Sequence, residues 1–255
     1  MQEFLGFGGY ARPAEGYLSW QHLTFVTSLV AVMVLLAVVL GRKNRFSPTH
    51  IKNRVLIAAA LLIDGVELFK IAVLCLRTVS LDPVLYNLPL FLCSIQLITI
   101  PMAAFCKGRL REAALDFVAI FGLLGAVLGT YGAGNNYSAY PVLSLDNVAS
   151  GVTHCISGFA ALYILISGMA SLQKRNMPVT FGILAGFCLG AWLANTLLDS
   201  NYMFLIRGDD TPYDVLFNLV GGNPVLYPLG VVALFFLYIA GFYAVHHLCS
   251  RKTKV

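Results

Sequence analysis

The chain has 255 residues, of which 58% are hydrophobic and 11% are charged, and its mean hydropathy is +0.79. This composition excludes an ordinary water-soluble domain and indicates an integral membrane protein whose helices pack within lipid. The formal net charge is +5, but the sequence shows no basic stripe with interleaved aromatic residues, so we expect no nucleic-acid partner.

Apolar runs long enough to cross the hydrocarbon as a helix, about 20 residues each, recur along the whole chain. The first of these runs is longer than the apolar region of a cleavable signal peptide, so we expect it to span the membrane and remain. The sequence predicts an all-α, polytopic protein of the cell membrane, with one domain over residues 1–255. Its seven predicted transmembrane helices cover residues 19–41, 54–77, 84–106, 112–131, 148–172, 178–199 and 225–248.

The basic residues predict the orientation of these helices. Most of them follow the first, third, fifth and seventh spans: Arg42, Lys43, Arg45, Lys52, Arg54, Lys107, Arg109, Arg111, Lys174, Arg175, Arg251, Lys252 and Lys254. Only Arg12, Arg77 and Arg207 belong to the opposite side, while Lys70 lies within a span. By the positive-inside rule, the N-terminus lies outside and the C-terminus lies inside.

The six cysteines lie mostly within apolar runs and form neither a CxxC pair nor a cluster with histidine at zinc-binding spacing. We therefore expect separate thiols, with no disulfide framework, no metal site and no cofactor. The glycine-rich run over residues 122–134 lies in or just after a predicted span, where small residues favour close contact between helices.

The second span carries three ionisable residues, Asp64, Glu67 and Lys70. Ionisable groups within a membrane are functional candidates because each costs about 2.5 to 3.5 kcal/mol at the helix centre. Their spacing places them on one helix face, so we expect Lys70 to pair with Glu67. A packing role for this pair and a role in proton transfer or in orienting a base both remain open.

The third span, with the sequence LPLFLCSIQLITIP over residues 88–101, places a cysteine between two prolines. Pro89 and Pro101 have no N–H to donate to the carbonyl groups of Leu85 and Leu97, so we expect the helix to be bent or loosened on both sides of Cys93. Freed backbone groups persist at membrane depth where protein or a water-lined cavity satisfies them. A kink that serves only packing is the alternative.

Counting helical rise at about 1.5 Å per residue places Cys93, His154 and Glu67 in the outer half of the bilayer. Asn195 lies near the outer end of the sixth span, followed by Asn201 and Tyr202. These residues are therefore predicted to lie at similar depths in the membrane, as residues that line one pocket must. Taken singly, a membrane cysteine is usually a packing residue and a membrane histidine usually bonds a neighbouring helix.

The motifs LPLFLC, an intramembrane His about sixty residues later, and NTLLDSNYMFL resemble the YwaF-like family of integral membrane proteins. That family is similar to animal transmembrane enzymes that move acyl groups between phospholipids with a Cys and a His. It is more distantly similar to ADTRP-type hydrolases of fatty-acid esters. Phe91 departs from the family pattern, which has His at this position.

The resemblance implies that Cys93 is the nucleophile and His154 the base of a membrane lipid acyltransferase that forms a thioester, with an ester hydrolase as the related reaction. Membrane lipids would be its substrates or ligands. As supporting roles, we expect Glu67 or Asn195 to hold the imidazole, and Asn201 and Tyr202 to donate to the oxyanion. The alternative is a transporter, channel or receptor-like lipid-binding protein without catalysis, for which the charged residues of the second span are the main argument.

Overall fold

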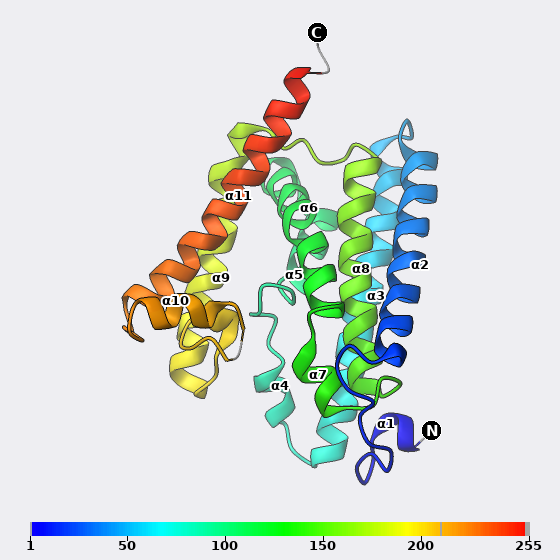
Figure 1. Cartoon of the computed structure of the whole chain (residues 1–255). Coiled ribbons are helices and arrows are strands. Elements are labelled where there is room, and N and C mark those ends of the chain that lie inside the picture. The colour runs from blue at the N-terminus through cyan, green and yellow to red at the C-terminus, as the bar shows by residue number, and fades with distance from the viewer. Residues whose placement is uncertain (1, 210, 253–255) are drawn as a thin grey trace.

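The computed structural model describes residues 2–209 and 211–252 and is all α-helical, as predicted (Figure 1). The long helices are α2 (Trp20–Asn44), α3 (Thr49–Thr78), α6 (Gly108–Thr130), α8 (Leu145–Ile166), α9 (Met177–Leu198) and α11 (Leu226–Lys252). The shorter helices are α1 (Gln2–Leu5), α4 (Asp82–Tyr86), α5 (Gln96–Phe105), α7 (Gly134–Ala139), α10 (Tyr213–Leu219) and the 3₁₀ turns η1 (Lys174–Asn176) and η2 (Tyr202–Phe204). Lys254, which contributes to the predicted charge pattern, and the ends of the predicted domain lie outside the described residues.

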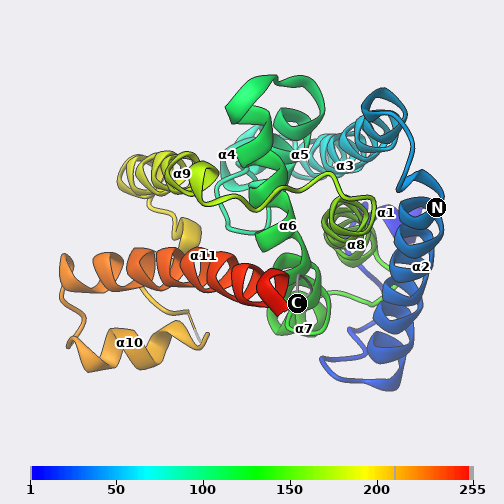
Figure 2. The ribbon, with the colours of Figure 1, turned by 90° about the horizontal axis from the view of Figure 1, so that it is seen from above.

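Helix α8 lies within a group of helices formed by α2, α3 and α6, and α9 and α11 lie on the other side of α6 (Figures 1 and 2). Two large apolar clusters hold the molecule together. One joins α3, α5, α6 and α8 around Leu56 and Tyr163. The other joins the α5 segment, α6, α9 and α11 around Phe117, Leu184 and Phe235. Helix α6 contributes to both clusters and therefore connects the two sides of the protein.

Five helical stretches among the described residues are long and apolar enough to cross a membrane: Trp20–Asn44, Gly108–Ala139, Leu145–Ile166, Lys174–Leu198 and Leu226–Cys249. This supports a multi-span membrane protein. Helix α3, with 30 residues, is also long enough to cross, but Asp64, Glu67 and Lys70 interrupt its apolar sequence. The seven crossings and their orientation stay predictions.

The third predicted span, 84–106, is wrong as a continuous helix. The chain forms α4, leaves the helical conformation between residues 87 and 95, and becomes helical again in α5. Pro89 lacks a donor and disfavours helical backbone in the residue before it. Ser94 then forms a local turn, because its Oγ accepts from Phe91 N–H at 3.0 Å and donates to Phe91 O at 3.1 Å.

The fifth predicted span, 148–172, also ends earlier than expected. Helix α8 stops at Ile166, and Gly168 has a left-handed φ of +71°. The N–H of Met169 then bonds Ile164 O at 2.9 Å, a pattern typical of glycine-terminated helices. The following connection to α9 is fixed by buried Asp116 of α6, which accepts from Leu172 N–H at 3.0 Å and from Tyr243 of α11 at 2.9 Å.

A polar cluster ties the N-terminal segment to the ends of two long helices. Arg77, in the last turn of α3, pairs with Asp146, in the first turn of α8, at 2.7 Å. Each charge therefore complements its own helix dipole. The Tyr10 hydroxyl donates to Asp146. Burial, followed by this hydrogen bond, raises the pKa of Tyr10 to about 12, so the hydroxyl stays a donor at physiological pH.

We expect Asp146→Asn to lower the free energy of unfolding by about 2 kcal/mol, because it leaves Arg77 partly buried without its counter-charge. The measurement is thermal or denaturant unfolding of the purified protein in detergent. The control is Glu112→Gln, which removes the exposed pair with Arg175 at 3.1 Å and should change stability by less than about 1 kcal/mol. Equal effects of the two substitutions would contradict a structural role for the Arg77–Asp146 pair.

Candidate active site

Cys93 lies in the non-helical segment that leads into α5. The first helix-type hydrogen bonds of this region run from Ile95 N–H to Phe91 O at 3.0 Å and from Gln96 N–H to Cys93 O at 3.4 Å. The backbone N–H groups of Cys93 and Ser94 lie near the Cys93 sulfur. The thiol is therefore held at the entry to a helix, where backbone donors favour negative charge.

His154 lies in the middle of α8, and its ring is oriented by its own helix. Nδ1 is 2.7 Å from the carbonyl oxygen of Ser150, one turn earlier. A carbonyl only accepts, so Nδ1 carries the proton of the neutral imidazole. This arrangement leaves Nε2 as an acceptor.

The side chains of Cys93 and His154 line the same cavity and interact with each other. With Nδ1 engaged by Ser150, Nε2 is the nitrogen that can accept the thiol proton, which is the arrangement of a nucleophile and its base. The structure thus brings together the two residues that the sequence analysis singled out from different parts of the chain.

Two glycines of α6 leave room for the side chains of Cys93 and His154. A Cβ atom built on Gly129 would lie 1.8 Å from Cδ2 and 2.1 Å from Nε2 of His154. One turn earlier, a Cβ atom on Gly125 would lie 3.5 Å from Cys93 Cβ, an ordinary contact. A third glycine, Gly122, lies close to the Ser157 carbonyl. The expectation that small residues in this run permit close helix contact is confirmed.

The pair opens into a small cavity of about 150 Å³ between α3, the α4–α5 segment and α8. Its charged residues are Glu67 and Lys70, which form the predicted ion pair at 2.7 Å. The remaining lining residues are Ile63, Tyr86, Asn87, Leu88, Phe91, Ser94, Leu97, Ser150 and Thr153. The cavity therefore combines a charged wall with an apolar wall next to the thiol.

Glu67 acts on His154 through its charge, but its hydrogen-bonding partner is Lys70. We expected Glu67 or Asn195 to hold the imidazole. In the structure, the Ser150 carbonyl does so. Asn195 instead holds residue 202: its Oδ1 accepts from Tyr202 N–H at 2.6 Å, and its Nδ2 donates to Tyr202 O at 3.0 Å.

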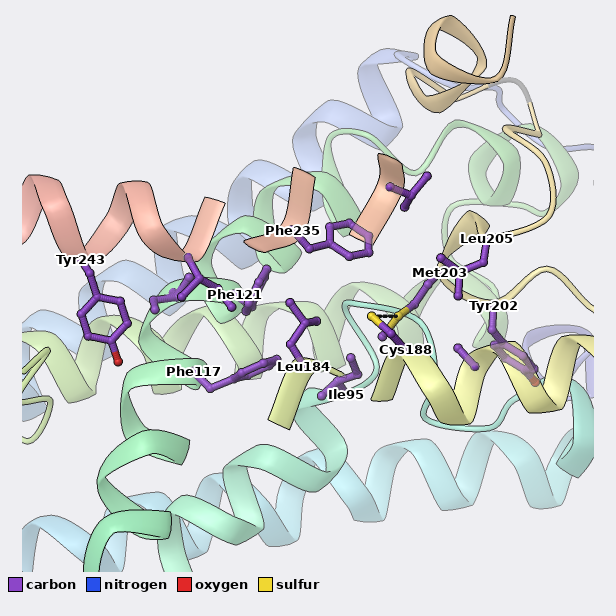
Figure 3. Close-up of a cluster of buried hydrophobic side chains, with 14 of the residues drawn as sticks. Ile95, Phe117, Phe121, Leu184, Cys188, Tyr202, Met203, Leu205, Phe235 and Tyr243 are labelled. Carbon is purple, nitrogen blue, oxygen red and sulfur yellow. Dashed lines mark hydrogen bonds between the residues drawn. The ribbon is translucent and has the colours of Figure 1, made fainter. Parts of the chain in front are cut away.

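Asn201 and Tyr202 also stabilise a turn, and neither is among the residues that line the cavity. Asn201 donates to Arg207 O and accepts from Ile206 N–H, at 2.8 and 2.9 Å. Tyr202 is buried in the cluster around Leu184 (Figure 3). These contacts give no support to a direct oxyanion role for either residue.

Tyr202 acts on the Cys93 segment from outside the cavity. Its hydroxyl donates to Leu85 O at 2.5 Å and accepts from Leu88 N–H at 3.3 Å, and its ring lies 4.9 Å from that of Phe91. Leu85 O is the carbonyl that Pro89 leaves without a helical donor. The partner of this freed carbonyl is therefore a protein group, the Tyr202 hydroxyl.

Sequence reasoning did not identify Ser150 or Gly129 as site residues. Ser150 contributes a backbone carbonyl, for which no side-chain pattern exists. The glycine-rich run did contain a signal for Gly129, but only the contact with His154 shows its purpose. The remaining cysteines behave as packing residues where they are buried: Cys188 contacts Met203 at 3.6 Å between sulfur atoms (Figure 3).

Among residues 2–209 and 211–252, no group of three or more His, Cys, Asp or Glu side chains has the geometry to hold a metal ion. No disulfide joins the cysteines of this part of the chain.

The long apolar helices, with a thiol–imidazole pair between them, define a multi-span helical membrane protein. The chain matches the model of the TMEM164 family over residues 17–243. This match covers most of the sequence, and the chain belongs to the TMEM164 family. Comparisons with curated proteins and with solved structures gave no match. The narrower resemblance to YwaF-like proteins stays a prediction.

Proposed function

We propose that this protein is a lipid acyltransferase of the cell membrane that carries an acyl group as a thioester on Cys93. The observation that carries the proposal is that one cavity brings Cys93 together with an imidazole whose Nδ1 is fixed by the Ser150 carbonyl. Nucleophilic catalysis by a thiol requires a base oriented in this way. The resemblance to Cys–His acyltransferases supports the same assignment.

In the first half-reaction, His154 Nε2 takes the proton from Cys93, and the thiolate attacks the carbonyl carbon of a phospholipid ester. The backbone N–H groups of Cys93 and Ser94, which lie near the thiol, would donate to the developing oxyanion. The carbon–oxygen ester bond then breaks, and His154 returns its proton to the alkoxide of the departing lysophospholipid. Cys93 is left as an acyl thioester.

In the second half-reaction, a hydroxyl group of an acceptor lysolipid gives its proton to His154 and attacks the thioester carbonyl. The carbon–sulfur bond breaks, and the thiolate recovers the proton from His154. Water in place of the acceptor gives hydrolysis. Leu88, Phe91 and Leu97 form the apolar wall beside the thiol and disfavour water there, so we expect transfer to exceed hydrolysis.

The test is trapping of the acyl-enzyme. Purified protein is mixed with phospholipid carrying an isotope-labelled acyl chain, quenched in acid and digested, and the modified peptide is located by mass spectrometry. We expect a hydroxylamine-sensitive acyl group on Cys93 and none on Cys106, a thiol outside the cavity. Cys93→Ala should abolish the label. Labelled product formed at the wild-type rate by Cys93→Ala would overturn the proposal.

One observation favours the alternative of a transporter or lipid-binding protein. Glu67 and Lys70 place a charged pair in the wall of the cavity, as a solute or proton path requires. Flux into proteoliposomes that depends on Glu67 and persists in Cys93→Ala would support transport. Binding of lipid without either flux or acylation would support a receptor-like role.

A further inference from the structure

A second, larger cavity lies outside the Cys93 site, on the outer side of the contact between α2, α3 and α8. Its volume is about 490 Å³, which lies within the range of about 300 to 1,000 Å³ typical of ligand pockets. Met33, Ala59 and Cys155 form its buried floor, and Val32, Leu36 and Leu62 form exposed apolar edges. We call it the α2–α3 groove.

The α2–α3 groove has one charged lining residue, Arg54, near the start of α3. Its side chain is exposed, and in the part of the chain that the structure describes its guanidinium has neither an ion pair nor a hydrogen bond within the protein. The sequence from residue 41 to residue 63 contains Arg42, Lys43, Arg45 and Lys52 in addition to Arg54, and no acidic residue. One end of the groove is therefore positively charged and lacks an internal counter-ion.

The dimensions of the groove match one lipid chain in one leaflet. Along α2 the lining extends from Leu29 to Leu40, about three helical turns or roughly 16 Å. Half of a hydrocarbon core of about 30 Å is close to this length. Arg54 lies beside the Leu40 end, because α2 ends at Asn44 and α3 begins at Thr49. The charged end thus lies near the helix ends, where headgroups are found.

We propose that the α2–α3 groove is a binding site for one anionic phospholipid, whose acyl chain fills the apolar part and whose phosphate pairs with Arg54. A guanidinium binds phosphate oxygens in a bidentate manner, and basic pockets between membrane helices are typical sites for acidic headgroups. This lipid is a resident ligand and not the substrate, since the groove lining and the cavity lining share no residue.

The test uses native mass spectrometry of the full chain, exchanged from detergent into an equimolar mixture of phosphatidylglycerol and phosphatidylcholine. We expect the wild-type protein to retain one phosphatidylglycerol in preference to phosphatidylcholine. Arg54→Gln should reduce this preference roughly tenfold, as for the loss of one charged hydrogen-bonding partner. Lys43→Gln removes a nearby exposed charge that does not line the groove and should have a clearly smaller effect.

A second variant tests the apolar part without changing any charge. Ala58→Phe fills the groove from α3, and we expect it to lose the bound phosphatidylglycerol. Val32→Phe, an exposed position on the α2 edge, repeats this test if the first variant does not fold. Cys93→Ala should retain the lipid, which separates this site from the proposed chemistry.

Three results would overturn the proposal. Equal losses in Arg54→Gln and Lys43→Gln would mean that only diffuse surface charge attracts the lipid. Full retention of lipid by the groove-filling variants would place the acyl chain elsewhere. A dimer free of lipid in the mass spectrum would mean that a second copy of the chain covers the groove.

Discussion

Gly129→Ala is expected to slow acylation of Cys93 by about 10² to 10⁴-fold, the usual contribution of a positioned base. A Cβ atom at this position would lie 1.8 Å from the imidazole of His154, far below any tolerated contact. Helix α6 is packed between two apolar clusters, so the ring, and not the backbone, is the group that moves. Nε2 then leaves the thiol, while the fold remains.

Gly125→Ala is the matched control, because it makes the same chemical change one turn earlier on α6. Its Cβ atom would lie 3.5 Å from Cys93 Cβ, so we expect acylation within about threefold of wild type. The second measurement is alkylation of Cys93 by iodoacetamide at pH 7, located by peptide mass spectrometry. This reaction uses the thiolate and needs no lipid substrate.

A variant that removes the imidazole tests whether Gly129 acts through His154. His154→Gln should slow alkylation as much as Gly129→Ala, and the double variant should be no slower than either, because both act through one imidazole. Additive losses, or equal losses in Gly125→Ala and Gly129→Ala, would show that Gly129 matters for packing alone.

The sequence predicted the long helices well because each is a run of apolar residues, and such runs form helices in lipid without help from the rest of the chain. Helix α8 ends earlier than predicted because of Gly168. The sequence does not distinguish this glycine from the other glycines of the apolar runs, so its role as a helix terminator could not be predicted. The segment around Cys93 was not predicted as well. Pro89 and the turn formed by Ser94 give it an irregular backbone in place of the predicted helix. That backbone depends on Tyr202, which lies more than one hundred residues away.

Cys93 and His154 could be proposed as a pair because His154 is the one histidine deep within a predicted span and because the family resemblance singled out both residues. Their supporting groups could not. The carbonyl that orients His154 belongs to Ser150 of the same helix, and any residue type could provide it. Asn195 and Tyr202 were expected to support the reaction directly, but their contacts are with the backbone of their own turn and of the Cys93 segment.

Asn195→Asp is expected to lower the free energy of unfolding by about 3 kcal/mol, although it changes a single NH₂ group to oxygen. Asn195 is 4% exposed, and its Nδ2 donates to Tyr202 O at 3.0 Å while its Oδ1 accepts from Tyr202 N–H at 2.6 Å. Aspartate keeps the acceptor but places a second oxygen against the Tyr202 carbonyl. Either a charge is buried, or the carboxyl takes up a proton in order to donate to Tyr202 O, and we expect each to cost a few kcal/mol.

The turn held by Asn195 is under backbone strain, which makes it sensitive to this loss. Asp199, Met203 and Phe204 have φ values of 49°, 56° and 56°. Residues other than glycine adopt this left-handed backbone conformation only when their surroundings require it. Releasing the turn also releases the Tyr202 hydroxyl from Leu85 and Leu88. We therefore expect acylation of Cys93 to decrease together with stability.

The measurements are thermal unfolding in detergent and trapping of the acyl-enzyme at a temperature at which the variant is folded. Asn218→Asp is the control, because it introduces the same charge at an exposed position of α10 and should leave both quantities unchanged within about 0.5 kcal/mol. A stable Asn195→Asp variant with normal acylation would mean that the Asn195–Tyr202 contact neither holds the turn nor positions Cys93. Loss of stability with normal acylation of the folded fraction would restrict its role to the turn.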